Sequence, residues 1–140
     1  MSSARRNRLK TLVRVAELQE AVAKGNAAKA LLAARAAESA AAEQLRVLRE
    51  SRLAGGTRQD LTRSAEQQQA LAAAVVEANG TAAQAASAQR EAVGAYTQAR
   101  RRHRLFDELA QRKRDEAEAE QERQEQRLAD DLAALKAVRR

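Results

Sequence analysis

The chain has 140 residues, with 26 lysines and arginines against 19 aspartates and glutamates, which leaves a net charge of +7. Alanine accounts for 36 residues, while there is one phenylalanine, one tyrosine and no tryptophan. Because alanine favours helix but buries little area, this composition excludes a sizeable globular core and favours long helices that pair along narrow seams.

Cysteine is absent, which excludes disulfides and thiolate metal sites. No apolar run approaches the roughly 20 residues that span a bilayer, and none long enough for a signal peptide follows the basic N-terminus. We therefore expect a soluble, cytoplasmic protein. The positive charge predicts acidic partners, which leaves open acidic protein surfaces, anionic lipid and nucleic acid. Because the chain is so polar, the alternative to a folded protein is a disordered one.

The N-terminal segment, residues 1 to 8, is polar and basic, and we expect it to be frayed. The first helix is predicted over about 9–53. Its apolar residues fall into two heptad frames, and the change of frame predicts a local slip near Gly25-Asn26. The first frame comprises Val15, Leu18, Val22 and Gly25, and the second comprises Leu31, Ala34, Ala41, Leu45 and Leu48.

Two glycine-containing breaks follow the first helix. Ala54-Gly55-Gly56-Thr57 is the stronger, because Gly can end a helix in the left-handed conformation and Thr57 or Asp60 can cap the next one. Asn79-Gly80-Thr81 is weaker and predicts a kink or a short loop. We thus expect a short helix over 60–78 and a long last helix over about 82–138. A continuous helix 60–138 is the alternative.

Two long helices joined by a compact middle predict an all-α fold, an elongated antiparallel two-helix coiled-coil hairpin with a short helical tip. We expect one domain over 1–140, with residues 54–80 as the tip. In this arrangement Leu9 and Leu12 meet Leu128 to Leu135 at the open end. A two-stranded homodimer would use the same residues.

No catalytic constellation is recognisable. His103 is the one histidine and lies within Arg100 to Arg104, so a histidine pair cannot form, and a solvated surface residue is the simpler interpretation. No Gly-rich phosphate loop precedes a Lys-Ser or Lys-Thr pair. We predict that the protein is not an enzyme and needs no cofactor, metal or small-molecule substrate.

Basic residues cluster at both ends of the chain, and an antiparallel hairpin would bring them together into one positive surface. These residues are Arg5, Arg6, Arg8, Lys10 and Arg14 at one end and Lys136, Arg139 and Arg140 at the other. Nucleic-acid binding is disfavoured, because single-strand binders use aromatic side chains to stack bases and this chain has only Tyr96 and Phe106.

The stretch 96–135 carries a family resemblance. Tyr96 is followed by the basic run Arg100 to Arg104, then by Leu105-Phe106-Asp107-Glu108-Leu109, a charged segment, and the sequence Glu-Gln-Arg-Leu-Ala-Asp-Asp at 125–131. This order resembles the C-terminal helix of the flagellar FliJ family, the coiled-coil protein of the flagellar type III export apparatus. The basic start and the pattern Leu9, Leu12, Val13, Val15, Leu18 also fit.

The resemblance implies an antiparallel two-helix coiled coil similar to the rotor stalk of rotary ATP synthases. Such a protein would lie at the inner face of the cell membrane, bind the hexameric export ATPase, promote its assembly and link it to the export gate protein, and in some systems handle export chaperones. The site residues implied are ATPase-binding Arg5, Arg6, Arg8, Arg139 and Arg140; rod-stabilising Leu12, Leu128, Leu132 and Leu135; and gate-contacting Leu71, Val75 and Val76.

Two other functions stay open at this point. A basic coiled coil could bind nucleic acid or anionic membrane, with strongly salt-dependent affinity. The second open function is that of the homologous stalk protein in a virulence type III secretion system. The sequence scarcely distinguishes this function from that of the flagellar protein. One departure from the family concerns the tip, because residues 54–95 contain no aromatic residue.

Overall fold

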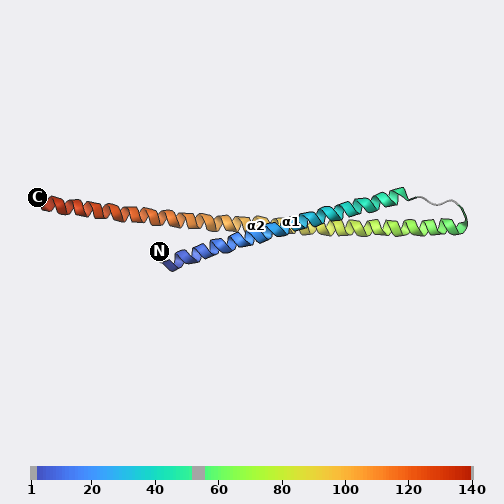
Figure 1. The fold of residues 1–140 in the computed structure, drawn as a ribbon, viewed down its shortest axis with the longest axis horizontal. Helices are drawn as coiled ribbons and strands as arrows, with labels where there is room; N and C mark the ends of the chain where they lie inside the picture. The colour runs from blue at the N-terminus through green and yellow to red at the C-terminus, as the bar shows by residue number, and fades with distance from the viewer. Residues whose placement is uncertain (1–2, 52–55, 140) are drawn as a thin grey trace. The chain divides into compact units, whose positions relative to one another are not determined.

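The computed structural model describes residues 3–51 and 56–139 of the chain. These residues form two α-helices, α1 (Ser3–Glu50) and α2 (Arg58–Val138), and contain no strand (Figure 1). The chain divides into two compact units: unit 1 comprises Met1–Glu20 with Gln98–Arg140, and unit 2 comprises Ala21–Thr97. Within each unit a stretch of α1 packs antiparallel to a stretch of α2. The predicted all-α fold of two antiparallel helices is confirmed.

The N-terminus of α2 is capped by a reciprocal pair of hydrogen bonds. The amide of Asp60 donates to the Thr57 hydroxyl at 3.3 Å, and the amide of Thr57 donates to the Asp60 carboxylate at 3.2 Å. Gly56 precedes this capping box with a φ of 140°, a conformation that side chains disfavour. The predicted caps are thus confirmed, whereas Ala54 and Gly55 lie outside the described residues.

The second predicted break, at 79–81, is wrong, and the alternative of a continuous helix 60–138 is confirmed, because α2 continues through 79–81 as one helix of 81 residues. The Thr81 hydroxyl donates to the carbonyl of Glu77 at 3.1 Å, a bond to the preceding helical turn that replaces the expected capping role. A glycine inside a helix costs only about 1 kcal/mol relative to alanine, which the long flanking helix can absorb. The short helix 60–78 and the separate tip therefore do not exist as such.

The first helix begins earlier than predicted, so the expectation of a frayed segment is wrong for residues 3–8. Helix α1 starts at Ser3, and Thr11 donates from its hydroxyl to the carbonyl of Asn7 at 2.9 Å within that helix. At its other end, α1 stops at Glu50, and Ser51 donates its amide to the Val47 carbonyl and its hydroxyl to the Leu48 carbonyl. Residues 52 and 53 lie outside the described residues.

A single heptad frame runs along the paired face of α1. Its members are buried or half-buried and recur at alternating spacings of four and three: Leu9, Val13, Ala16, Glu20, Ala23, Ala27, Ala30, Ala34, Ala37, Ala41, Gln44 and Leu48. Because this frame is continuous, the slip predicted near Gly25-Asn26 is wrong. Of the two predicted frames, only the one through Ala34, Ala41 and Leu48 is the buried one.

The first predicted frame faces solvent instead. Val15, Leu18 and Val22 are 44%, 59% and 64% exposed. The physical reason is that alanines on the paired faces of both helices let the two backbones approach closely. Helix α1 therefore carries two apolar stripes, a small-residue stripe that is used and a large-residue stripe without a described partner.

The paired face of α2 follows the same repeat until Lys113, and its members are Gln68, Leu71, Val75, Ala78, Ala82, Ala85, Gln89, Ala92, Tyr96, Ala99, His103, Phe106, Ala110 and Lys113. From Arg114 to Arg139 every described residue is exposed. The cause is the difference in helix length, 81 residues in α2 against 48 in α1. We call residues 114–139 the unpaired segment.

Candidate partner-binding surfaces

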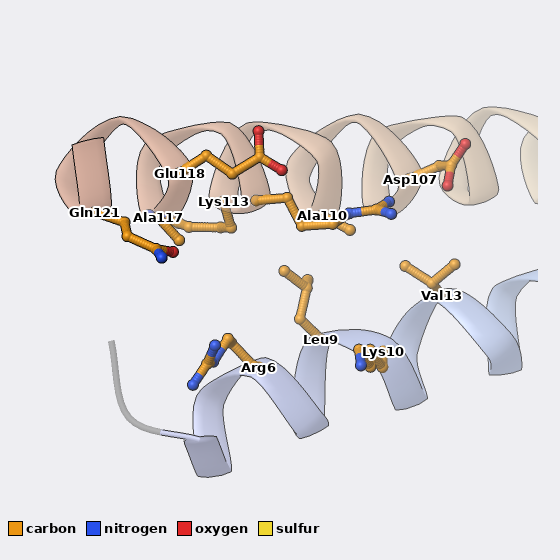
Figure 2. A pocket seen from close by; sticks show the side chains of 11 residues that line it. Arg6, Leu9, Lys10, Val13, Asp107, Ala110, Lys113, Ala117, Glu118 and Gln121 are labelled. Carbon is orange, nitrogen blue, oxygen red and sulfur yellow. The ribbon is translucent and has the colours of Figure 1, made fainter. Parts of the chain in front are cut away.

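Unit 1 contains a groove where the first turns of α1 face α2. Its volume is about 480 Å³, and its apolar floor is formed by Leu9, Val13, Ala110 and Ala117. Figure 2 shows the side chains of Leu9 and Val13 extending from α1 toward α2. The groove exists because alanines on α2 stand opposite, so the helices do not fill the space between them.

Charged side chains surround this floor. The cations are Arg6, Lys10, Lys113 and Arg114, and the carboxylates are Asp107 and Glu118. Cations therefore outnumber carboxylates at the rim. Such a groove can accept an apolar side chain of a partner segment while the rim attracts carboxylates near it.

A polar pair interrupts the apolar seam of unit 1. His103 Nδ1 forms a short hydrogen bond with the Glu20 carboxylate, and both side chains are largely shielded, at 26% and 22% exposed. One position away, Arg102 donates to the Gln19 side chain at 3.3 Å. A polar pair inside a coiled-coil seam fixes which residues stand opposite one another, because any slip leaves both groups without their partner.

The expectation that His103 is a solvated surface residue is therefore wrong. The basic neighbours Arg100 to Arg104 suggest a surface position for His103, whereas its place in the heptad puts it in the seam. His103 follows Tyr96 and Ala99 and precedes Phe106 at seam spacing, and Glu20 follows Val13 and Ala16 in the same way. Two polar residues at facing seam positions are the signal that could have identified the pair.

The unpaired segment is held helical by local side-chain bonds. Arg123 donates to Glu120 at 2.9 Å, Gln121 to Glu125 at 3.3 Å, and Gln126 to Asp130 at 3.3 Å. Pairs at these spacings stabilise a helix by about 0.2–0.5 kcal/mol each. The segment therefore keeps its helix with little burial, and beyond Gln121 it lines no groove with α1.

The predicted basic surface does not form within one chain. Arg5, Arg6 and Arg8 lie in the first turns of α1, and Arg6 lines the groove beside Gln121. Arg139 follows the end of α2, more than four helical turns beyond Gln121. Because α2 is unbroken, a helix of that length separates the two groups by roughly 26 Å. Arg140 lies outside the described residues.

The residues expected to hold the open end together are not brought together either. Leu128, Leu132 and Leu135 are 60–63% exposed, and Leu12 is 46% exposed. Leu12 instead lines a small groove with Leu109. The expected contact fails for the same reason, since the continuous α2 carries its C-terminal leucines past the N-terminus of α1.

The residues expected to contact an export gate protein lie in unit 2. Leu71 and Val75 are half-buried on the paired face of α2, while Val76 is 72% exposed. Only Val76 of the three presents most of its side chain to solvent. Nearby, Gln68 donates to the Ser51 hydroxyl at 3.4 Å, which ties the end of α1 to α2.

Two kinds of feature are absent from the part of the chain that the structure describes, a metal-ion cluster and a membrane-spanning helix. Within ranges 3–51 and 56–139, no three His, Asp or Glu residues are placed to hold a metal ion together. Among the same residues, no helix has the length and apolar character needed to cross a membrane.

Comparison with known proteins gives one match. The family model described as "Flagellar FliJ protein" matches residues 5–140, which is nearly the whole chain. No curated protein and no solved structure matches the sequence. Two antiparallel helices with a basic N-terminus and a long C-terminal helix agree with the family match, and the chain belongs to the FliJ family, with a role connected to flagellar protein export.

Proposed function

We propose that this protein is a non-enzymatic, stalk-like coiled coil of the flagellar export apparatus that binds the hexameric export ATPase, promotes its assembly and activity, and couples it to the export gate. It would act in the cytoplasm at the inner face of the cell membrane, and its contribution to flagellar biogenesis and motility would be through protein export. Export chaperones are further partners in this proposal.

The unpaired segment is the observation that supports this proposal most. Its residues from Arg114 to Val138 are helical and exposed, many of them are charged, and those beyond Gln121 line no groove with α1. A single helix that extends past its partner helix can enter a narrow central space that a two-helix rod could not. The basic first turns of α1, with Arg5, Arg6 and Arg8, would then meet acidic surface at the rim of the ring.

A stalk of this kind would influence the ATPase through differential binding. Its surface is not six-fold symmetric, so it contacts the subunits of a hexamer unequally and stabilises some subunit conformations over others. Coupling to the gate would use unit 2, where Val76 is exposed.

The test is the ATP hydrolysis rate of the cognate export ATPase with and without this protein, measured together with the fraction of hexamer. We expect both to rise. Replacing Arg5, Arg6 and Arg8 with Ala should raise the concentration for half-maximal stimulation about tenfold, because three exposed ion pairs of about 0.5 kcal/mol each are lost.

A matched control replaces Arg58, Arg63 and Arg90 with Ala, which removes the same charge from exposed positions on α2 in unit 2. If the control weakens stimulation equally, the effect is one of net charge and not of the N-terminal surface. No stimulation and no hexamer formation by the unaltered protein would refute the stalk proposal. Salt-dependent binding to nucleic acid or anionic vesicles would then become the function to measure.

A further inference from the structure

One side of unit 1 combines apolar and basic side chains from both helices. On α1, a series of exposed residues recurs at alternating spacings of three and four, which places them along one face of that helix: Arg5, Arg8, Leu12, Val15 and Gln19. Leu12 and Val15 are 46% and 44% exposed. The series contains two arginines and no carboxylate, so α1 presents an apolar centre with a basic end.

Helix α2 presents a similar series. Its members recur at the same spacings and are Arg102, Leu105, Leu109, Arg112 and Glu116. Leu105 and Leu109 are 66% and 42% exposed. The carboxylate of Glu116 forms an ion pair with Lys113 Nζ at 3.2 Å. The single acidic residue of this series is therefore already paired with a cation of its own helix.

The two series adjoin on the same side of the helix pair. At one end of the face, Arg102 donates to the Gln19 side chain at 3.3 Å. Farther along, Leu12 and Leu109 line a groove of about 280 Å³ between the helices. The charged residues that line this groove are all cations, namely Arg5, Arg8 and Lys113. We call the two series together with Lys113 the basic-apolar face.

The composition of this face specifies the chemistry of its partner. Four large aliphatic side chains are partly exposed there, and covering them removes apolar area from water. Even with the pair of Lys113 and Glu116 left out, four arginines remain. A partner that fits must carry apolar side chains along one line and carboxylates beside them.

The shape of the face favours a helix as that partner. A groove between two packed helices accepts the ridge of side chains on a third helix, which satisfies its own backbone hydrogen bonds. The stretch from Arg5 to Gln19 is roughly 21 Å long, which corresponds to about four turns of such a helix.

A lipid surface and nucleic acid fit the same face less well. An anionic bilayer is flat and would also meet the continuation of α2, where residues 115–131 contain eight carboxylates and two arginines. A short helix can bind the face without reaching that acidic segment. Nucleic acid would leave the aliphatic side chains unused, because bases stack on aromatic rings and the two series contain none.

We propose that the basic-apolar face binds an acidic amphipathic helix of a partner protein, which lies along the groove between Leu12 and Leu109 as a third helix. Its apolar side chains contact the aliphatic centre of the face, and its carboxylates pair with the arginines around it. The site goes beyond the proposed contact of the N-terminal arginines with the ATPase ring, because it requires apolar burial and the arginines of α2 as well.

Synthetic peptides provide the test. The probe is a labelled helical peptide of about 18 residues with leucines every third and fourth position and glutamates beside them. Fluorescence anisotropy at about 150 mM salt should give a dissociation constant on the order of 10 µM. Two comparison peptides, one with the leucines changed to serine and one with the glutamates changed to lysine, should each bind about tenfold more weakly or worse.

Variants of the protein assign the binding to this face. Leu12→Ser with Leu109→Ser, and separately Arg8→Glu with Arg112→Glu, should each raise the dissociation constant of the probe about tenfold or more. The matched controls are Leu18→Ser with Leu128→Ser and Arg14→Glu with Arg104→Glu, which change exposed residues of unit 1 outside the face and should leave binding unchanged. Circular dichroism establishes that each variant is folded.

A fluorophore can report the position of the bound peptide, because the protein has no native cysteine. An environment-sensitive dye on Val15→Cys should shift its emission to the blue when the probe binds, since the peptide covers that position. The same dye on Glu17→Cys, an exposed position of α1 outside the face, should not respond.

Three results would overturn the proposal. They are equal binding of the glutamate and lysine peptides, equal weakening by the face variants and their controls, and no binding of the probe at about 500 µM. Flotation with phosphatidylglycerol vesicles is the competing measurement. If the face variants lost vesicle binding while the probe did not bind, the face would be a lipid-binding surface. No assay contains the ATPase, so these outcomes are independent of the proposed stalk function.

Discussion

Residues 68–113 and 114–139 belong to the same helix, yet they are stabilised in different ways. The first stretch buries a seam of mostly small residues against α1, with Ala99 8% exposed. The second has no buried or half-buried residue and relies on bonds between side chains three or four positions apart. A sequence that favours helix therefore does not show whether that helix is paired. The two stretches of α2 differ because α1 is long enough to pair with the first stretch only.

The largest expected effect contrasts one alanine from each stretch. Ala99→Gln should lower the free energy of unfolding by about 2 kcal/mol, because it overfills a close-packed seam and buries an amide without a partner. Ala119→Gln, in the unpaired segment, should stay within about 0.5 kcal/mol. Urea unfolding followed by circular dichroism measures both. Equal effects at the two positions would remove the distinction between the stretches.

The polar pair of unit 1 gives the next effect. Glu20→Ala and His103→Ala should each cost about 1 kcal/mol, and the double variant should cost less than their sum because the two residues interact. A double-mutant cycle from urea unfolding gives the coupling energy. Arg102→Ala with Gln19→Ala, an exposed and longer bond, serves as the comparison and should show weaker coupling. A coupling near zero for Glu20 with His103 would contradict the seam pairing.

Two glycines test the continuity of α2, on which the existence of an unpaired segment depends. Gly80→Ala should stabilise the protein by about 0.5–1 kcal/mol, because Gly80 is helical and an added Cβ would meet no atom within 4 Å. Gly56→Ala should destabilise it by about 1 kcal/mol, since φ is positive there and the Cβ would approach the Asp60 carboxylate at 2.8 Å. Thermal unfolding separates the two signs. Destabilisation by Gly80→Ala would indicate a break in the helix after all.

The smallest effect concerns a local ion pair on the exposed face of the paired region. Arg46 contacts Glu43 at 2.5 Å and Glu50 at 2.7 Å. The hydrogen bond from Arg46 lowers the pKa of Glu43 below its ordinary value of 4.5. A lowered pKa means that this pair stabilises the folded state above about pH 4.5 and stops doing so as the pH falls through the lowered value.

Glu43→Gln should therefore unfold slightly more easily than the unaltered protein at neutral pH, and the difference should vanish in acid. Thermal unfolding at several pH values follows this change. Glu38→Gln, at an exposed position of α1 outside this ion pair, is the control and should show a smaller dependence. A difference for Glu43→Gln that grew toward low pH would contradict the sign of the pKa change.

Much of the fold follows from local sequence. Thirty-six alanines, the absence of proline and the Gly-Gly-Thr turn before Asp60 predict two long helices and the cap between them, because these depend on backbone preferences and hydrogen bonds close in the chain. The composition also excludes a globular core. Family membership was likewise visible in the order of residues from Tyr96 to Asp131.

Other features depend on which faces meet. From sequence, the frame of Val15, Leu18 and Val22 is expected to be buried before Gly25 and the frame of Ala34, Ala41 and Leu48 after it. Only packing against α2 shows that the alanine stripe faces inward, since close approach of two backbones requires small residues on one of them. The same is true of Glu20 and His103, which are 83 positions apart and meet only when the helices pair.

The chain's own sequence thus determined the helices, their capped turn, the charge distribution and the family. Tertiary structure decided the register, the inward stripe, the continuity of α2 past Gly80 and hence the extent of the unpaired segment. The physical reason is that helix formation depends on residues that are neighbours in the chain. Register and overhang depend instead on the pairing energy summed along two helices, and no single stretch of sequence determines that sum.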